Sequence, residues 1–548
     1  MLLLMLFISA LSGSFAQDID KDVRVVKPYE PKISDANKVG LVPEEEDTAT
    51  FRAQYNYEVT PVKQTTDYEV TPFKAAKMVS ESIPKLYKSH LKLGYGNYVT
   101  PLFELHMNSL RDKDRIVGGS LTHKSSHGKV RLANDEKVFA GYADNHLGVF
   151  GSKLYRRSKI DGSISLNSNT RYFYGYNPDS ILIPPFEKEE IKQRYLNPGI
   201  DFTWESTHAD SNHLNYQVDI DYDYLQDFYE HNEHSIGINT YFERYRRGAL
   251  FGLTTAAYTY SGIIDDTTKF RTFLEVKPLF SKASEEWRFI LGFNTTAEFF
   301  DEDFKLRFYP RAHLQFTIIE DVLIPYLGVD GKLQANNYLH LYQENPYIIP
   351  GTVAEPSNHK IIGYGGLKGK FSSKGSFHFK ATYSMINDAV FFVNDTNTYL
   401  ANQFIAVTDD IDAVNLFGEV NYDYSEKIKI NLNANIYRYN TFVLDEPWHK
   451  QNFDATISVH YNLRNKIMAY ADIFFIGKRF ATDNSPENDM EIITLDPFVD
   501  ANLGLEYRYT KNLSFFLNLS NLSATRYNIW YQYPAQRFMA LGGFTYSL

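Results

Sequence analysis

Two short segments place histidine beside groups that could take part in catalysis. His123-Lys-Ser-Ser-His127 sets imidazoles near hydroxyls, and Glu230-His-Asn-Glu-His234 sets them near carboxylates. Such pairs can act as general acids and bases or activate a nucleophile. However, 15 histidines in a chain of 548 residues produce neighbours of this kind by chance. We therefore predict no catalytic residue and a protein that is not an enzyme.

Metal, cofactor and nucleic-acid motifs are equally weak. His231 and His234 are the best candidate metal ligands, but a zinc site needs three or four ligands fixed by further hydrogen bonds. The chain has no cysteine, which excludes a thiolate site and any disulfide. It has no phosphate loop or dinucleotide fingerprint, and its formal net charge of -11 argues against nucleic acid. We predict no metal, no cofactor and no nucleic-acid partner.

Acidic side chains recur at every second position in the segment HLNYQVDIDYDYLQDFY. Asp219, Asp221 and Asp223 form one row there, and an apolar set forms the other. Alternation with period two places the rows on opposite faces of a β-strand, one dry and one wet. Comparable polar rows later in the chain contain Glu419, Asp423, Asp500, Glu506 and Arg508.

These charged rows have two interpretations, which the sequence leaves open. If the strands line a pore, rings of acidic side chains would bias it toward cations. Alternatively, the rows only keep an interior wetted, or bond to whatever fills it. In both cases these eight charged residues are candidates for facing a lumen.

Many further segments alternate in the same way, among them residues 428–436, 499–509 and 513–520, although Phe516 interrupts the polar set of the last one. The chain contains 41 Tyr and 40 Phe, and tyrosine suits a membrane interface, where a ring meets water through its hydroxyl. A mean hydropathy of -0.37 does not oppose this, because every second residue of a barrel strand points into the lumen. We predict an all-β fold, a transmembrane antiparallel outer-membrane β-barrel of about 22 strands (range about 16–22).

The links between these segments alternate between short and long. The short links lie near residues 246–248, 372–375, 425–427, 464–465 and 511–512. The long links span residues 336–360, 439–448 and 478–495. Bacterial outer-membrane barrels have short periplasmic turns and longer external loops, so the pattern predicts which links face the periplasm. The last segment, Arg537 to Leu548, is predicted to close the barrel against the first strand.

The N-terminal part divides at two places. Residues 1–16 read as a signal peptide, with Ser14-Phe15-Ala16 as the cleavage site before Gln17. Residues 17–88 are predicted to be an extended periplasmic segment, because they are rich in proline and contain the pentapeptide Tyr-Glu-Val-Thr-Pro twice, at residues 57–61 and 68–72. The repeat could contact a periplasmic partner or the lumen wall, or the segment could be a solvated leader. The barrel is predicted over residues 89–548.

Two C-terminal segments carry a family resemblance. NPYIIPGTVAEPSNHKIIGYGGLKGKFSSKGSFHFKATYSMINDAVFF, from Asn345 to Phe392, resembles the barrel region of TonB-dependent receptors. In that region an Asn-Pro loop leads into a strand, a tight turn and a long strand ending in an aromatic or apolar pair. NLSNLSATRYNIWYQYPAQRFMALGGFTYSL, from Asn518 onward, resembles the last hairpin of the same family. The resemblance implies an outer-membrane receptor barrel.

The sequence departs from that family in two places. Receptors of the family carry a globular plug ahead of the barrel, and residues 17–88 are too few to form it, so we expect no globular plug domain. Leu548 also replaces the aromatic residue often found at the end of outer-membrane barrels.

One N-terminal run loosely resembles the extended box that pairs with TonB. It consists of Asp22, Val23, Arg24, Val25 and Val26. Short apolar runs of this kind also arise by chance, and without a plug to displace, energised gating has no evident target. Pairing with a periplasmic energy-coupling protein is therefore one of two open readings.

Two functions follow from this reading, both in the outer membrane of a Gram-negative bacterium, with lipid as the first partner. In the first, the protein is a transport channel or receptor for a small nutrient, captured by the external loops. In the second, the plugless barrel is a structural subunit of a larger outer-membrane assembly, secretion or uptake complex, with other outer-membrane or periplasmic subunits as partners. The barrel resemblance favours transport, and the missing plug favours a scaffold.

Overall fold

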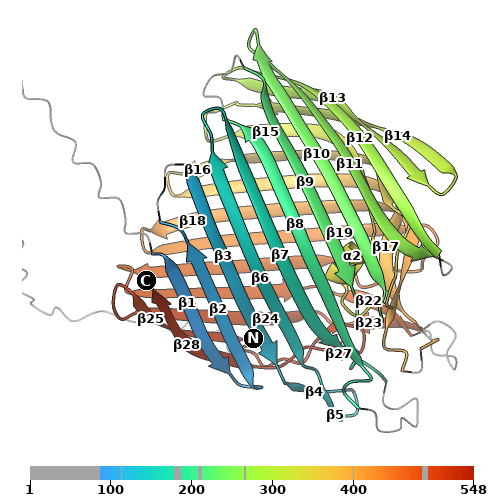
Figure 1. Ribbon diagram of the computed structural model, residues 1–548, viewed down its shortest axis with the longest axis vertical. Helices are drawn as coiled ribbons and strands as arrows, with labels where there is room; N and C mark the ends of the chain where they lie inside the picture. The colour runs from blue at the N-terminus through green and yellow to red at the C-terminus, as the bar shows by residue number, and fades with distance from the viewer. Residues whose placement is uncertain are drawn as a thin grey trace, which may run out of the picture. The chain divides into compact units, whose positions relative to one another are not determined.

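The alternating segments form the strands of one closed antiparallel barrel (Figure 1). The computed structural model describes residues 87–548 except 111, 113, 178–186, 208–212, 265–266, 396, 399 and 484–490. Twenty-two strands of this part form a single sheet whose first and last members pair with each other. The predicted fold class is therefore confirmed, with a strand number at the upper end of the predicted range.

The first eleven barrel strands are β1 (Ser89–Gly96), β2 (Thr100–Asn108), β3 (Arg115–Ser126), β6 (Tyr142–Leu154), β7 (Ser158–Tyr172), β8 (Lys192–Ser206), β9 (Asn215–Gln226), β10 (Asn232–Arg246), β11 (Ala249–Ile264), β12 (Thr267–Ala283) and β13 (Trp287–Phe300). The other eleven are β14 (Asp303–Phe316), β15 (Ile324–Gln334), β16 (Ser357–Ser372), β17 (Gly375–Asn394), β18 (Phe404–Ser425), β19 (Ile428–Thr441), β20 (Phe453–Leu463), β21 (Ile467–Ile476), β24 (Phe498–Arg508), β25 (Leu513–Ser520) and β28 (Met539–Ser547). Each strand pairs with the next in this order, and β28 pairs with β1 through Leu93↔Phe544 and its neighbours.

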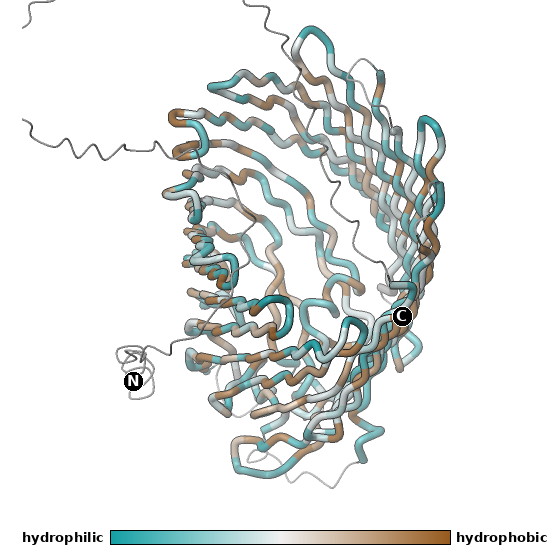
Figure 2. The backbone as a smooth tube through the Cα atoms, turned by 90° about the vertical axis from the view of Figure 1, so that its left-hand side faces the viewer, coloured by the Kyte–Doolittle hydropathy of each residue, from teal (hydrophilic) through white to brown (hydrophobic). Residues whose placement is uncertain are grey.

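The outer face of the barrel is apolar. Large aliphatic and aromatic side chains stand exposed on it at every second position, as the alternating colours along the strands in Figure 2 illustrate. Examples are Ile164, Ile200, Ile236, Leu291, Phe308, Leu416 and Ile436. Exposed aromatic residues also lie near the ends of several strands, among them Trp204, Phe371, Tyr424, Tyr509 and Tyr546. An apolar band flanked by aromatic residues, on a sheet without free edges, fits the outer membrane of a Gram-negative bacterium.

The one interruption of the polar rows noted in the sequence has a structural reason. Phe516 points away from the apolar outer face and is buried against Leu102 and Leu541, which lie on β2 and β28. This small apolar cluster lies beside the β1–β28 seam, where the barrel closes. Phe516 therefore contributes to closure and not to a wetted wall.

The two ends of the barrel differ. At one end, which we call the turn end, the links are short, for example residues 247–248, 373–374 and 426–427, and the chain ends there. At the other, the loop end, lie the helix α2 (Tyr338–Glu344) and three hairpins, which Figure 1 shows together at one end of the strands. The hairpins pair β4 (Lys129–Arg131) with β5 (Lys137–Phe139), β22 (Arg479–Asp483) with β23 (Glu491–Leu495), and β26 (Asn528–Trp530) with β27 (Tyr533–Pro534). None of the helices in the described residues is long and apolar enough to cross a membrane.

The predicted short turns are confirmed, whereas two of the predicted long links are wrong at their ends. The link predicted to reach residue 360 stops before Ser357, and the link predicted over residues 439–448 covers residues 442–452. β16 begins earlier than predicted because its pairing with β15 and β17 continues at the loop end, where polar residues such as Asn358 replace the apolar alternation, whereas β20 begins later than predicted, at Phe453. The link predicted over residues 478–495 is not irregular, since it contains the β22–β23 hairpin.

Candidate functional site

The loops at the loop end pack into a hydrophobic core of their own. We call this packed set the cap and define it as residues 127–141, 173–177, 335–356, 442–452 and 521–538. The core that the cap forms with the adjoining strand ends comprises Val130, Leu132, Val138, Ala140, Phe173, Tyr174, Tyr176, Ile191, Tyr195, Leu225, Tyr338, Leu341, Tyr342, Ile348, Phe392, Phe404 and Tyr533. Tyr195 lies on β8 and Phe392 on β17, the sixth and fifteenth strands around the barrel. A cluster that joins strands so far apart in the sheet must cross the mouth of the barrel.

Tyrosine rings form the centre of the cap. Tyr533 is fully buried, and its ring stacks on that of Tyr347 with centroids 3.8 Å apart. The ring of Tyr174 packs edge-on against the ring of Tyr533, with centroids 4.9 Å apart. Each buried hydroxyl finds an acceptor, because Tyr174 donates to Pro534 O at 3.0 Å and Tyr533 donates to Asn402 O. Tyrosine therefore supplies both the apolar area and the hydrogen bonds that fix one loop against another.

Helix α2 is held by a carboxylate from the barrel wall. No side chain of its own satisfies the free N–H groups of its first turn. Instead, Glu233 on β10 accepts hydrogen bonds from Tyr338 N at 2.7 Å, Leu339 N at 3.3 Å and Asn337 Nδ2 at 2.6 Å. The two carboxyl oxygens of Glu233 therefore satisfy donors of the first turn that the helix leaves free. The wall thus determines where α2 begins.

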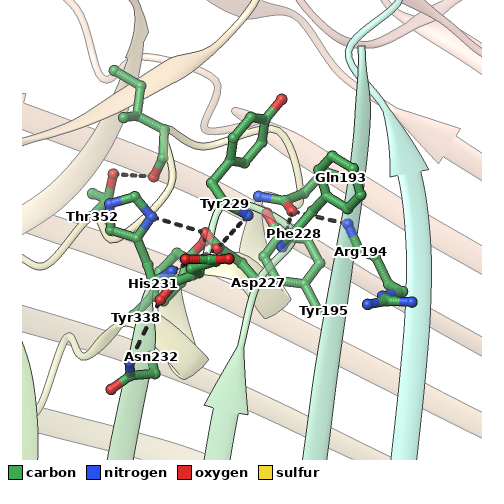
Figure 3. Close-up of polar contacts among 12 residues, drawn as sticks. Gln193, Arg194, Tyr195, Asp227, Phe228, Tyr229, His231, Asn232, Tyr338 and Thr352 are labelled. Atoms are coloured by element: carbon green, nitrogen blue, oxygen red, sulfur yellow. Dashed lines mark hydrogen bonds and ion pairs between the residues drawn. The ribbon is translucent and has the colours of Figure 1, made fainter. Parts of the chain in front are cut away.

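A second buried carboxylate, Asp227, ties the same helix to the loop between β9 and β10 (Figure 3). Its Oδ2 accepts from the Tyr338 hydroxyl at 2.8 Å, while its Oδ1 accepts from the backbone N–H groups of Tyr229 and His231 at 2.8 and 2.9 Å. The imidazole of His231 lies 3.5 Å from the same carboxylate. Buried hydrogen bonds to a carboxylate are about twice as strong as neutral ones. Together, Glu233 and Asp227 anchor the cap to the wall.

His449 links two segments of the cap to strand β17 of the barrel wall. Its Nδ1 donates to Phe392 O at 3.0 Å, and its Nε2 accepts from Tyr531 N at 3.3 Å. Its ring also lies 4.9 Å from Trp530. These partners require the neutral imidazole, and burial lowers the pKa of His449 to about 3, with Arg479 and Lys450 acting in the same direction.

We expect the cap to loosen in acid because of His449. The folded pKa lies below the value of about 6.5 in the unfolded chain, so its stabilising contribution is present above about pH 6.5 and is lost as pH falls toward 3. At pH 4.5 the loss amounts to about 2–3 kcal/mol. The protection factors of residues 442–452 and 528–534, which correct for the slower intrinsic amide exchange in acid, should therefore fall between pH 7 and 4.5. In the His449→Gln variant, which cannot titrate, this change should largely disappear; an equal change would contradict the assignment.

The predicted lumen residues lie on the face opposite to the exposed apolar side chains. On β9, Asp219 accepts from Thr203 at 2.8 Å and Asp223 accepts from Asn197 at 3.1 Å, with Asp221 between them. Asp219 and Asp223 are therefore bonded to neighbouring wall residues of β8.

The other predicted residues lie elsewhere on the wall. Glu419 on β18 accepts from Asn421 and Asn431, and Asp423 is exposed near the turn end of the same strand. Asp500 on β24 accepts from the Tyr527 hydroxyl at 2.7 Å, close to the cap. Glu506 and Arg508 lie near the opposite end of that strand. β9, β18 and β24 are the seventh, sixteenth and twentieth strands, so these charges do not form one site.

No family model matches the sequence, and no curated protein shows significant similarity to it. Among solved structures, the ferripyoverdine receptor of the outer membrane of Pseudomonas aeruginosa matches with a TM-score of 0.65 at 10% identity, covering 85% of this chain and 72% of that one. The FrpB iron transporter from Neisseria meningitidis gives 0.65 at 10%, covering 85% and 82%. The ferric-catecholate import receptor Fiu from E. coli gives 0.63 at 9%, covering 85% and 82%.

This chain has the barrel fold of these receptors. The resemblance to TonB-dependent receptors seen in the sequence is thus confirmed at the level of the fold. The described residues consist of the barrel and the loops at its two ends, with no globular plug among them. The signal peptide, the segment 17–86 and the TonB-box-like residues 22–26 lie outside the described residues, and their roles stay predictions.

The histidine segments considered for catalysis are far from forming a site. His123 contacts Asn145 at 2.6 Å and Ser125 at 3.1 Å. His231 faces Asp227, whereas His234 contacts the Tyr222 hydroxyl at 2.9 Å. Within the described part of the chain, no three His, Asp or Glu side chains gather to hold a metal ion.

The sequence reading missed the cap. Helix α2 has only seven residues, too short for a visible periodicity, and the tyrosines of the cap lie in loops. One signal was present, because the loops contain unusually dense aromatic runs, such as Phe173-Tyr174-Gly175-Tyr176 and Trp530-Tyr531-Gln532-Tyr533. From the sequence, the excess of tyrosine is assigned to membrane interfaces alone, whereas six of the 41 tyrosines belong to this core.

Proposed function

We propose that this chain is an outer-membrane transporter for a small nutrient, whose external mouth is closed by its own loops. The observation that carries the proposal is the cap, which crosses the mouth of a barrel with a polar inner face. The proposal is supported by the shared fold with proteins whose names describe them as iron transporters or siderophore receptors. Barrels of about 22 strands enclose a lumen that must be blocked when transport is not under way.

In this proposal, a solute passes when the cap moves away from the wall. The hydrogen bonds of Tyr338 to Glu233 and Asp227 are the local contacts that must break. A periplasmic energy-coupling protein that pairs with residues 22–26 would make these openings more frequent, as the resemblance to the TonB box suggests. That partner is part of the proposal and rests on the sequence alone.

A disulfide between the cap and the wall tests the proposal. Asn337 Nδ2 lies 3.4 Å from Ser235 Oγ, so the two side chains are neighbours, and the chain has no other cysteine. A titration of free thiols shows whether cysteines at these two positions have formed the bridge. In planar bilayers we expect brief openings of the wild-type protein and at least a tenfold lower opening frequency of the oxidised Ser235→Cys/Asn337→Cys variant.

Reduction of the double variant should restore the openings, which separates the lock from damage to the fold. Each single cysteine variant serves as a control that cannot form the bridge. If the oxidised variant opens as often as the reduced one, the cap is not the gate and the proposed route fails.

One observation favours the second function, a structural subunit of a larger assembly. Phe442 and Val443 at the loop end are 68% and 84% exposed, which is unusual for large apolar side chains in a well-defined turn. The buried carboxylate of Asp409 holds this turn by accepting from the N–H groups of Phe442, Val443 and Leu444 at 2.9–3.1 Å. A fixed turn that presents apolar side chains to water is suited to a protein partner.

The variant Phe442→Ser/Val443→Ser tests this second candidate. We expect the protein to fold as before and, if it is a subunit, to lose the partners that copurify with the native protein from detergent. Ile529→Ser, which changes an exposed apolar residue elsewhere on the cap, serves as the control. Unchanged copurification in both variants would count against a scaffold that binds through this turn.

A further inference from the structure

A cavity of about 370 Å³ lies where the cap meets the barrel wall. Helix α2 and the residues after it contribute Tyr342, Gln343 and Pro346, and the inner faces of β7 and β8 contribute the rest. The wall residues are Asn167, Asn169, Arg171, Tyr195 and Asn197. This volume is within the range of about 300–1,000 Å³ that is typical of small-molecule sites.

The lining is polar, and its one charged side chain is neutralised by an ion pair with a residue outside the lining. Asn167, Asn169, Asn197 and Gln343 contribute side-chain amides. The only charged side chain, Arg171, is paired with Asp144, with Nη1 and Oδ1 2.7 Å apart. A charged ligand would therefore lose its hydration here without gaining an opposite charge, which is costly.

The amides have hydrogen-bonding capacity to spare. Gln343 is exposed, and its amide has no protein partner in the described part of the chain. Asn167 bonds to His146 at 2.8 Å and to Asn197 at 3.4 Å, which leaves one of its amide hydrogens free. Each side-chain amide can both donate and accept, so hydroxyl groups, which also do both, are the matching chemistry.

The back of the cavity is rigid and aromatic. Tyr195 and Tyr342 stack with ring centroids 4.2 Å apart, and both are almost completely buried. Tyr195 also donates its hydroxyl to Pro346 O at 3.1 Å, so the wall and the segment after α2 are fixed to each other. A site held in place in this way loses little entropy when it binds a ligand.

We propose that this cavity binds a neutral, hydroxyl-rich solute of the size of a mono- or disaccharide. The inference deepens the proposed transport function and rests on it, because it names the chemical class of the solute. A bound sugar would touch both α2 and the wall, so its binding is coupled to the position of the cap. By linkage, a ligand of the closed cap also stabilises the closed cap.

Saturation-transfer NMR on the full chain, in a detergent without a sugar head group, tests the inference. The probes are sucrose, which is neutral, glucuronate, which is anionic, and glucosamine, which is cationic. We expect transfer to sucrose alone, and at least a fivefold smaller signal for Asn169→Ala/Gln343→Ala. Asn433→Ala, which removes an amide from β19 far around the barrel, should bind as the wild type does.

A second measurement separates loss of the site from loss of the fold. Sucrose should slow hydrogen exchange of residues 338–344 in the wild type and in Asn433→Ala, but not in Gln343→Ala, where an exposed residue is changed. A sucrose signal that is equal in all variants, or a variant-sensitive signal from a charged probe, would overturn the inference. If sucrose binds as expected while the disulfide lock has no effect on openings, the site stands and the transport proposal fails; the reverse result removes only the site.

Discussion

Replacing residues 336–355 with a Gly-Ser-Gly linker is expected to produce a barrel with a steady, large conductance in planar bilayers. The replaced segment contains the cap residues Tyr338, Leu341, Tyr342, Tyr347 and Ile348. Its removal takes away the stacking partner of Tyr533 and the helix that is anchored by Glu233. Barrels of about 16–18 strands already leave an aqueous channel, so a wider barrel without its cap should conduct at least as well.

The barrel itself should survive this change. The closed sheet is formed by residues outside the segment, and β15 and β16 would remain neighbours through pairs such as Leu327↔Gly365. Replacing residues 317–323 at the turn end with the same linker provides the control, and that variant should stay closed. A folded cap-deletion variant that remains silent would show that another part of the protein blocks the lumen.

The barrel could be predicted from the sequence because the alternation within each strand depends only on the lipid and water at its two faces. A strand with lipid on one side and water on the other must alternate, and residues 428–436 do so whatever lies beside them. The closing contact could be predicted for the same reason. The alternation of β28 identifies its face, and a sheet in a membrane has no acceptable free edge, so its partner can only be β1.

The cap could not be predicted because its contacts join distant parts of the chain without any period. Tyr174 donates to Pro534 across 360 positions of sequence, and His449 bonds to residues from two other segments. An aromatic residue in a loop carries no information about which other loop receives it. The sequence therefore shows that the loops are rich in aromatic residues, but not which of these residues pack together.

The candidate site shows the same limit. Alternation predicts that Asp219 and Asn169 face the interior, but it does not say that α2 folds back to Asn169. Rows of acidic side chains can be recognised in a sequence as candidates for a site. The amide side chains that line the cavity cannot, because such residues occur on any polar surface. Register between strands and the path of one long loop decide which of these side chains meet.

The second large effect concerns the seam where the barrel closes. Gly543→Ala is expected to lower the urea midpoint of unfolding strongly, because a Cβ at this position would overlap Leu93 O and lie 2.7 Å from Gly94 Cα. Both atoms belong to the backbone of β1, paired with β28 through Gly94↔Gly543, and cannot rotate away. Overpacking of this kind costs about 1–3 kcal/mol.

Gly542→Ala is the matched control for this variant. The added Cβ would meet Phe516 O at 3.6 Å and Leu517 Cδ1 at 3.8 Å, which are ordinary contacts. Both substitutions exchange glycine for alanine in one strand, on opposite faces of the sheet, so the two variants share the change in backbone freedom that follows from replacing glycine. The difference between the two midpoints therefore measures the cost of forcing β1 and β28 apart. Equal midpoints would mean that the closing seam lies elsewhere or has a different register, and the pairing of Leu93 with Phe544 would then be wrong.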